Sequence, residues 1–377
     1  MAGHEMMQLI AFRNKETEYA VLHRFREALC AGLQKEGVQI SLIDLNLSDL
    51  QSFLRAIYSS PPDCTFAFNG IRMLSDGQSL ADQIDVPHIS WQVDAAHFGR
   101  EYAEMPLQLI ITPDQTSADI FRKWGAQAFF LPHGGELFPL IHEKIYPISF
   151  PCSIEDPEIA EAHFSPQLIE AADRVLKTPS LCYQDALKGI IDLDDPENDE
   201  LVQEFDLYLR AKERIALIRG LRGLPLHLFG NVRGESTRNF QEIIGGDCSS
   251  FTFHTGLSVD QMIEAMQRSS ILVNSSPMFK TGAHERIFYG QGAGALVLTN
   301  DTPWIQQNYK PGEDILTYQI DKLPTTVEAI KHLLNHPKEL SAMASQGRER
   351  MAKEHTWELR AKQLLVIVKE ELLKFYE

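Results

Sequence analysis

Short apolar runs alternate with helical stretches along residues 1–145, and this alternation limits the possible folds more than any other feature of the chain. Residues 7–12 (MQLIAF) are such a run, and residues 16–35 repeat apolar side chains every three or four positions, as an amphipathic helix does. Strands separated by helices form a parallel sheet that helices cover on both faces. The sequence therefore predicts a doubly wound α/β domain here. The further strand-like runs are 38–44, 65–68, 88–93, 109–112 and 128–131, and the further helical stretches are 47–58 and 114–124.

A second series of the same kind begins near residues 148–150. A mostly helical stretch interrupts it, and strand-like and helical runs alternate again from residue 226 onward. We expect two α/β domains and a last helix. Two such sheets imply a cleft between the domains, and clefts of this kind favour ligand binding. The predicted parts are the first domain, 1–145, the second domain, 146–355, with a helical insertion at 154–220, and the C-terminal helix segment, 356–377.

Length and charge exclude several classes of protein. With 377 residues, the chain is long enough for two domains. Its 52 acidic residues outnumber its 35 basic ones, so the formal charge is −17 and the chain attracts nucleic acid poorly. The chain contains no run of 18 apolar residues, so the sequence predicts no integral membrane segment. The five cysteines are scattered and never in C-x-x-C spacing, so we expect free thiols, a cytoplasmic location and no zinc site.

The stretch 273–300 (VNSSPMFKTGAHERIFYGQGAGALVLTN) holds the strongest signal for a ligand site. A strand-like run and a polar loop are followed by a helix that is predicted to begin near Ala283. A helix N-terminus exposes unpaired N–H groups and the positive end of the helix dipole, which suit a phosphate. Lys280, His284 and Arg286 can add charge-assisted hydrogen bonds. The alternative is a tight contact between helix and sheet with an ordinary solvated arginine, since the spacing is neither Walker A nor G-x-G-x-x-G.

Several motifs in this half of the chain resemble one family. HERIFYGQGAGALVLT, which begins at His284, is similar to the pattern R-V-F-E-A-x-A-C-G-A-x-x-L-T of the CgeB-like glycosyltransferases, relatives of the retaining family-4 type. A Pro-Gly-Glu turn follows at 311–313, and His355, Thr356 and Arg360 match the closing helix of that family. The resemblance implies the GT-B fold of two Rossmann-like domains, with a last helix that crosses back to the first domain. It also implies metal-independent transfer of a sugar from a nucleotide-diphosphate sugar, most often of UDP or GDP, with retention of the anomeric configuration.

The sequence departs from the family pattern at the donor site. Tyr289 stands where relatives carry a glutamate that binds the ribose, and Thr281 stands where they carry a second glutamate. The turn 151–156 lacks the arginine and lysine that clamp the diphosphate in relatives. Neutralisation of the diphosphate would then rest on Lys280, Arg286 and the helix end. The residues that we expect at the nucleotide sugar are Ser275, Lys280, Thr281, Gly282, His284, Glu285, Arg286, Tyr289 and Gly256.

Candidate residues in the first domain follow predicted strands. Asp94 and His97 come after the strand-like run 88–93, where a base or a contact to a sugar hydroxyl is plausible, so both are catalytic candidates beside Arg286. Their alternatives are a helix-capping aspartate and a surface histidine. The remaining acceptor-side candidates, with a simple turn and plain linker geometry as their alternatives, are Asn69, Gly70 and His133.

The acidic run that contains Asp192, Asp194 and Asp195 resembles a D-x-D metal motif, but it lies in the helical stretch and not at a strand end, so a solvated loop is favoured. The leading hypothesis is a metal-independent, hexosyltransferase-type glycosyltransferase with a soluble or protein acceptor and no cofactor besides its donor. One alternative is a catalytically degenerate relative that binds a sugar nucleotide or a protein partner. Another is a sugar-nucleotide epimerase on the same fold.

Overall fold

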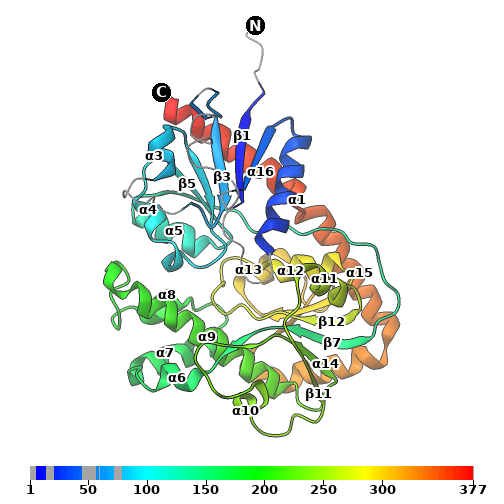
Figure 1. Ribbon diagram of the computed structural model, residues 1–377. Coiled ribbons are helices and arrows are strands. Elements are labelled where there is room, and N and C mark those ends of the chain that lie inside the picture. The colour runs from blue at the N-terminus through cyan, green and yellow to red at the C-terminus, as the bar shows by residue number, and fades with distance from the viewer. Residues whose placement is uncertain (1–5, 14–20, 45–56, 59, 72–78, 377) are drawn as a thin grey trace. The chain divides into compact units, whose positions relative to one another are not determined.

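The computed structural model describes residues 6–13, 21–44, 57–58, 60–71 and 79–376. The chain divides into two compact units, one made of residues 1–134 with 355–377 and the other of residues 135–354 (Figure 1). Each unit contains a six-stranded sheet, and all strand pairs in both sheets are parallel. The structure thus confirms the two parallel-sheet α/β domains that the sequence predicts.

The first unit has the strand order β2-β1-β3-β4-β5-β6. Its strands are β1 (Gln8–Arg13), β2 (Gln39–Asp44), β3 (Cys64–Phe68), β4 (His88–Trp91), β5 (Gln108–Thr112) and β6 (Gln127–Phe130). Its helices are α1 (Val21–Lys35), α3 (Leu80–Ile84), η1 (Ala96–Phe98), α4 (Glu101–Glu104), α5 (Gln115–Lys123) and α16 (Trp357–Tyr376). Residues 16–20 and 47–56 of two predicted helices lie outside the described residues.

The first unit has buried central strands, and the last helix of the chain packs against its first helix. Every residue of β3, β4 and β5 is buried, as expected for strands covered on both faces. Helix α16 packs against α1, and a Cβ atom at Gly32 would lie 2.8 Å from Ala361 Cβ. The missing side chain at this position therefore lets the two helices approach closely.

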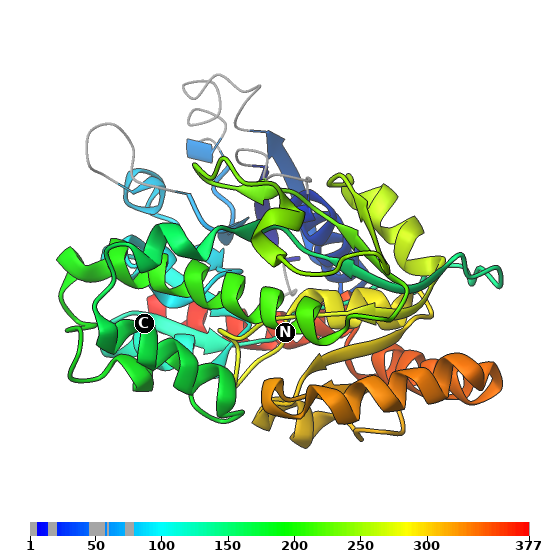
Figure 2. The same cartoon turned by 90° about the horizontal axis from the view of Figure 1, so that it is seen from below.

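The second unit has the strand order β11-β9-β7-β12-β13-β14. Its strands are β7 (Tyr146–Pro151), β9 (Leu226–Phe229), β11 (Phe251–His254), β12 (Ser269–Val273), β13 (Leu296–Asn300) and β14 (Leu316–Tyr318). The helices that alternate with these strands or follow them are α10 (Phe240–Ile244), α11 (Val259–Gln267), α12 (Glu285–Gly292), α13 (Pro303–Asn308), η3 (Ile320–Lys322), α14 (Leu323–Asn335) and α15 (Pro337–Glu354). Figure 2 shows α14 and α15 in orange, lying side by side.

Residues 135–145 belong to the second unit, although the sequence predicts a first domain that ends at residue 145. Phe138 N donates to Gly292 O at 3.1 Å, and Arg348 Nη2 donates to Phe138 O at 2.8 Å. Lys144 Nζ donates to Gln267 O at 2.7 Å. These contacts to backbone atoms hold the segment against the ends of α11 and α12 and against α15, and no apolar periodicity in the sequence indicates them.

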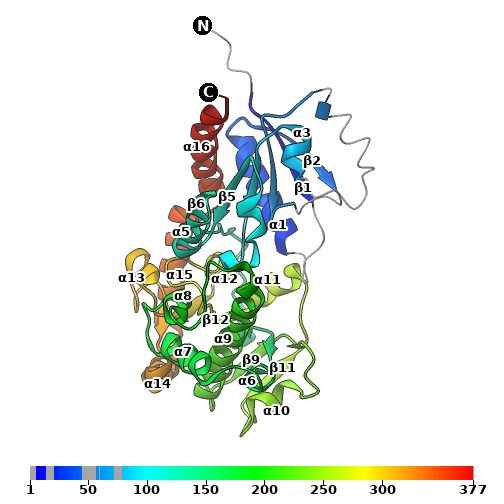
Figure 3. The same ribbon diagram turned by 90° about the vertical axis from the view of Figure 1, so that its left-hand side faces the viewer.

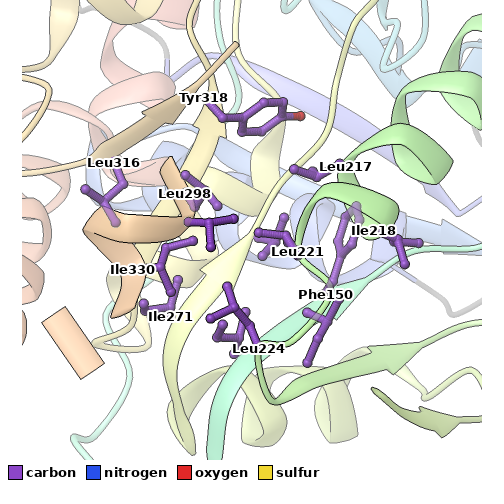
Figure 4. Close-up of a cluster of buried hydrophobic side chains, with 14 of the residues drawn as sticks. Phe150, Leu217, Ile218, Leu221, Leu224, Ile271, Leu298, Leu316, Tyr318 and Ile330 are labelled. Atoms are coloured by element: carbon purple, nitrogen blue, oxygen red, sulfur yellow. The ribbon is translucent and has the colours of Figure 1, made fainter. Parts of the chain in front are cut away.

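The predicted insertion is mostly helical, and its last helix forms part of the core of the second unit. It consists of β8 (Ile154–Glu155), α6 (Pro157–Glu161), α7 (Pro166–Lys177), α8 (Tyr183–Leu187), η2 (Pro196–Asn198) and α9 (Asp199–Gly220). Strand β8 pairs with the short β10 (Val232–Arg233), and α9 packs against α6 and α7 (Figure 3). Leu217 and Ile218 of α9 join Phe150 and Ile271 of the sheet in one apolar cluster (Figure 4).

Candidate functional site

The carboxyl ends of β7 and β12 lie at the switch point of the second sheet. Strand β7 is the first of its sheet in the sequence, with β9 and β11 on one side and β12 to β14 on the other. Open parallel sheets bind ligands outside the carboxyl ends of the strands at this point. The segments that emerge here begin at Cys152 after β7 and at Asn274 after β12. A ligand site in this unit is therefore expected between these two strand ends.

The loops after β7 and β9 are held together closely. Cys152 N donates to Phe229 O at 2.9 Å, and Asn231 N donates to Ser153 Oγ at 3.2 Å. A Cβ atom at Gly230 would overlap Cys152 O, so this position requires glycine. The backbone at the edge of the sheet is fixed before any ligand arrives.

Helix α12 begins at Glu285, with His284 as its N-cap, two residues later than the predicted start at Ala283. His284 Nδ1 accepts a hydrogen bond from Arg286 N at 3.2 Å and lies 3.0 Å from Glu285 Oε2. Burial lowers the pKa of His284, which favours the neutral ring whose Nδ1 can accept from the backbone. His284 thus caps its own helix, and only its Nε2 is left for a ligand.

Arg286 is held in place by a fixed amide. Its Nη1 donates to Asn274 Oδ1 at 3.2 Å. Asn274 Nδ2 in turn donates to Thr299 Oγ1 at 2.9 Å and to Ser276 Oγ at 3.2 Å. Because both donors of this amide are used, its oxygen has to face the arginine. The guanidinium is therefore oriented at the strand end where the sequence predicts an anion site.

Two further arginines contact the segment after β7, and sequence reasoning missed both. Arg214 lies on α9, is 7% exposed and donates from Nη1 to Ser153 O at 2.6 Å. Its Nε has no hydrogen-bond partner among the residues that the structure describes. Burial, with a smaller effect of the charge of Arg286, lowers the pKa of Arg214 to about 10, so the group stays charged at neutral pH. Arg233 of β10 pairs with Glu155 of β8, in the segment after β7. Burial, and to a smaller extent the charge of Arg233, lowers the pKa of Arg286.

Lys280 is buried inside the second unit, where its positive charge partly compensates the negative charge of Glu213. Glu213, on α9, is 2% exposed and accepts hydrogen bonds from Ser275 Oγ at 2.5 Å and from Asn300 Nδ2. Burial raises the pKa of Glu213, and the charge of Lys280 opposes this shift. Lys280 Nζ is buried and lies 3.4 Å from Val175 O, and burial lowers its pKa. Lys280 and Ser275 are therefore engaged inside the unit and do not present their polar atoms at its surface.

Tyr289 reaches a carboxylate of the 135–145 segment. The side chain is 4% exposed, and its hydroxyl donates to Glu136 Oε1 at 2.9 Å. Gly282 is buried and Thr281 is half-buried in the loop before α12. Tyr289 thus lies one turn along α12 from Arg286, with its hydroxyl already hydrogen-bonded.

Gly256 follows β11, an edge strand of the second sheet that contributes to a flat aromatic surface. Its N–H lies 3.5 Å from Asn231 Oδ1, which links the loops after β9 and β11. The rings of His254 and Phe229 are stacked with their centroids 4.3 Å apart. His254 is half-buried, so part of this surface is open to solvent.

In the first unit, the structure brings some acceptor-side candidates together and buries others. Asn69 Oδ1 accepts from Val93 N at 3.1 Å, which joins the ends of β3 and β4 next to the half-buried Asp94. Gly70 has φ +61°, and a Cβ there would overlap Ser90 Oγ. The ends of β3 and β4 therefore carry three of the predicted acceptor-side residues, Asn69, Gly70 and Asp94.

His97 and His133 are the two candidates that lie inside the first unit. His97 is 1% exposed on η1, with its ring edge-on to Trp124 at 5.1 Å. His133 is 0% exposed and stacks on Trp91 at 6.3 Å within an aromatic cluster that includes Trp357. The structure therefore does not show the surface histidine that was the alternative for His97, and His133, for which plain linker geometry was the alternative, is buried as well; both rings fill apolar space.

The acidic run offers no metal geometry in the structure. Asp192 and Asp194 are exposed, Asp194 N donates to Asp192 Oδ1 at 3.0 Å, and Asp195 caps η2. Over residues 6–13, 21–44, 57–58, 60–71 and 79–376, no three His, Cys, Asp or Glu side chains lie close enough to hold a metal ion. Within the same residues, no helix is long and apolar enough to cross a bilayer.

Comparison with known proteins decides the class of the fold. Residues 210–366 match the family model described as "Glycosyl transferase-like". A sucrose-phosphate synthase from Thermosynechococcus elongatus superposes with a TM-score of 0.56 at 11% identity, over 98% of this chain and 100% of the other. The fold is GT-B.

Two further GT-B structures are similar over almost the whole chain. HepE from Anabaena in complex with UDP-glucose has a TM-score of 0.57 at 10% identity, over 97% of this chain and 100% of the other. An alpha-glucosyltransferase in complex with UDP has a TM-score of 0.58 at 10% identity, over 96% of this chain and 100% of the other. No curated protein sequence matches the chain. Thus the two sheets form the GT-B fold, and residues 210–366 match the glycosyl transferase-like family model.

Proposed function

We propose that the protein transfers a hexosyl group from a nucleotide-diphosphate sugar to an acceptor, without a bound metal ion and with retention of configuration, as a CgeB-like member of the GT-B enzymes. The observation that carries the proposal is that Arg214 donates to Ser153 O after β7 and Arg286 donates to Asn274 Oδ1 after β12, with Arg233 of β10 paired to the segment after β7. Relatives of this type clamp the diphosphate with cations after the first strand of this domain, where this chain has none. Arginines from α9, β10 and α12 supply the missing positive charge.

The role proposed for the arginines follows from the place where negative charge develops during sugar transfer. When the bond between sugar and phosphate breaks, negative charge grows on the leaving diphosphate, and oriented donors stabilise it without reorganisation. Arg286 is oriented by Asn274, and Arg214 by Ser153 O. A guanidinium can bind two phosphate oxygens in parallel, and such charge-assisted bonds are roughly twice as strong as neutral ones. The arginines would thereby take the part that a metal ion plays in other transferases.

The other parts of the nucleotide sugar are assigned to residues near the same strand ends of the second sheet. We place the ribose and base near Gly256 and the stacked rings of Phe229 and His254, where a flat surface is half open. UDP is favoured over GDP because HepE and the alpha-glucosyltransferase are bound to UDP-glucose and UDP. In the first unit, Asp94, next to Asn69 and Gly70, is the residue that we assign to the acceptor or to a sugar hydroxyl.

One observation favours a second candidate, a protein that binds a nucleotide sugar without turnover. Tyr289 and Thr281 stand in place of two carboxylates of the retaining relatives, and the Tyr289 hydroxyl is already bonded to Glu136. Donor contacts that those carboxylates make would then be absent. Binding without transfer is the outcome that would support this candidate.

Both candidates are tested by incubating the full chain with UDP-, GDP-, ADP- and dTDP-sugars and following binding, hydrolysis and transfer. We expect turnover of a UDP-sugar, and a loss of turnover of about 100-fold in Arg286→Ala. The exposed Lys331→Ala on α14 removes the same charge far from the strand ends and should leave turnover unchanged. Binding without turnover would select the second candidate, and neither binding nor turnover of any donor would remove both.

A further inference from the structure

Strand β8, which follows β7, forms a two-stranded sheet with β10, and the two faces of this sheet carry different residues. Ile154 pairs with Val232, and Glu155 pairs with Arg233. Ile154 is fully buried and packs with Val232 in an apolar cluster that includes Ile215 of α9. Because successive side chains of a strand point to opposite faces, Glu155 and Arg233 share the face that points away from this cluster. A carboxylate and a guanidinium group are therefore neighbours on that face.

Glu155 has a carboxylate oxygen that the protein leaves without a hydrogen bond. The side chain is half-buried, and its Oε2 is shielded from solvent and has no hydrogen-bond partner among the residues that the structure describes. The next residue, Asp156, differs, since its Oδ2 accepts from Arg238 Nε at 2.7 Å and from Ser236 Oγ at 2.8 Å. A buried acceptor without a donor is unfavourable, and a ligand that supplies the donor removes this cost.

Glu155 belongs to the segment that connects the residues assigned to the diphosphate with those assigned to the base. Arg214 Nη1 donates to Ser153 O at 2.6 Å, two positions before Glu155. Asn231 N donates to Ser153 Oγ at 3.2 Å, and Asn231 Oδ1 lies 3.5 Å from Gly256 N on the base side. Burial lowers the pKa of Arg214, and the charge of Glu155 is one of the effects that oppose this shift. Since the ribose of a nucleotide joins its base to its phosphates, the ribose would lie along this segment.

We propose that Glu155 accepts hydrogen bonds from the 2′- and 3′-hydroxyl groups of the donor's ribose, so that the site selects ribonucleotides over deoxyribonucleotides. The inference rests on the proposed function, because it concerns the donor of the same reaction. An ionised carboxylate accepts hydrogen bonds and repels phosphate, so the ribose hydroxyl groups suit it and the phosphates do not. A donor that lacks these hydroxyl groups leaves the carboxylate unpaired in the complex, and sites of this kind discriminate strongly against the missing group.

Nucleotide binding to the full chain tests the proposal. Calorimetric titration should show that the wild type binds UDP about 10- to 100-fold more tightly than 2′,3′-dideoxy-UDP, with 2′-deoxy-UDP in between, because hydrogen bonds to a charged group are lost. In Glu155→Ala this preference should fall to about threefold or less, and Glu155→Gln, which keeps one acceptor, should show an intermediate preference. An equal preference for UDP in the wild type and in Glu155→Ala would overturn the proposal.

Pyrophosphate separates the loss of a ribose contact from damage to the site. It contains no ribose, so Glu155→Ala should bind it at least as tightly as the wild type does, because a nearby negative charge has been removed. Weaker pyrophosphate binding by folded Glu155→Ala would show that the substitution disturbs the arginines, and would contradict a role confined to the ribose. The matched control is Glu158→Gln, which removes the same charge from an exposed side chain paired with Arg238 and should keep the wild-type preference for UDP.

The same titrations distinguish a failure of this assignment from a failure of the proposed function. If the wild type binds UDP and pyrophosphate but Glu155→Ala keeps the full preference for UDP over the dideoxy analogue, the assignment of Glu155 is wrong and the donor site stands. If the wild type binds neither UDP nor pyrophosphate, the donor site itself is contradicted, and the assignment of Glu155 with it.

Discussion

Glu213 and Lys280 are buried opposite charges, and burial shifts the pKa of each while the charge of the other opposes that shift. Glu213 also accepts from Ser275 and Asn300, so removing its charge leaves a buried ammonium without a counter-charge. We expect Glu213→Gln and Lys280→Met each to lower the free energy of unfolding by about 3 kcal/mol. The double variant should lose less than the sum of the two. Urea unfolding of all four proteins measures this coupling, and strictly additive losses would show that the two charges do not interact.

His88 is predicted to make folding sensitive to acid. The ring is 1% exposed on β4, its Nδ1 lies 2.8 Å from Thr65 Oγ1, and burial lowers its pKa to about 3. The unfolded chain binds a proton near pH 6.5 and the folded chain does not, so stability falls as pH drops from about 6.5 to about 3. The contribution is at most about 1.4 kcal/mol per pH unit. His88→Gln should reduce this slope, whereas the exposed His336→Gln should not, and equal slopes in both would contradict the assignment.

Helix α12 offers a matched pair of glycines for testing close packing. A Cβ at Gly292 would overlap the backbone oxygen of Glu136, which cannot move without displacing the 135–145 segment. A Cβ at Gly290 would meet Leu272 Cδ2, the end of a flexible side chain. We expect Gly292→Ala to lower the free energy of unfolding by about 2–3 kcal/mol, and Gly290→Ala to cost less. Urea unfolding of both variants tests the ranking, and the reverse order would show that the segment is not packed as described.

Periodicity predicts the secondary-structure elements well, because the apolar positions of strands and helices are local signals. Asp114, at the start of the predicted helical stretch 114–124, is the N-cap of α5 and accepts from Ser117 N at 3.0 Å, and the strand over 109–112 falls within β5. Residues 135–145 were beyond this reasoning, because backbone hydrogen bonds to distant residues hold them. The start of α12 at Glu285 is set by the cap that His284 forms, which the sequence does not indicate.

In the molecule as a whole, the order of the strands determines which of the residues predicted from the sequence lie close together. Arg286 could be predicted because it lies in the first turn of the helix that follows β12, and carboxyl ends of parallel strands share one edge. Arg214 could not, since it lies 61 positions after Ser153 and reaches this residue through the helical insertion. His97 and His133 were predicted from their position after strands, but burial within the first unit depends on distant aromatic partners such as Trp124 and Trp357. Long-range packing thus accounts for both kinds of difference.

Arginines from separate elements are proposed to bind the diphosphate, and calorimetric titration with UDP measures this binding. Arg214→Gln should weaken UDP affinity about 10- to 100-fold, because it removes charged hydrogen bonds. Arg214→Lys, which keeps the charge but not the donor fork, should fall between Arg214→Gln and the wild type. The control is Arg222→Gln, an arginine just after α9 that donates to Asp247 O at the opposite end of the sheet, and it should bind UDP like the wild type. Equal UDP affinity in folded Arg214→Gln and Arg222→Gln would contradict the account.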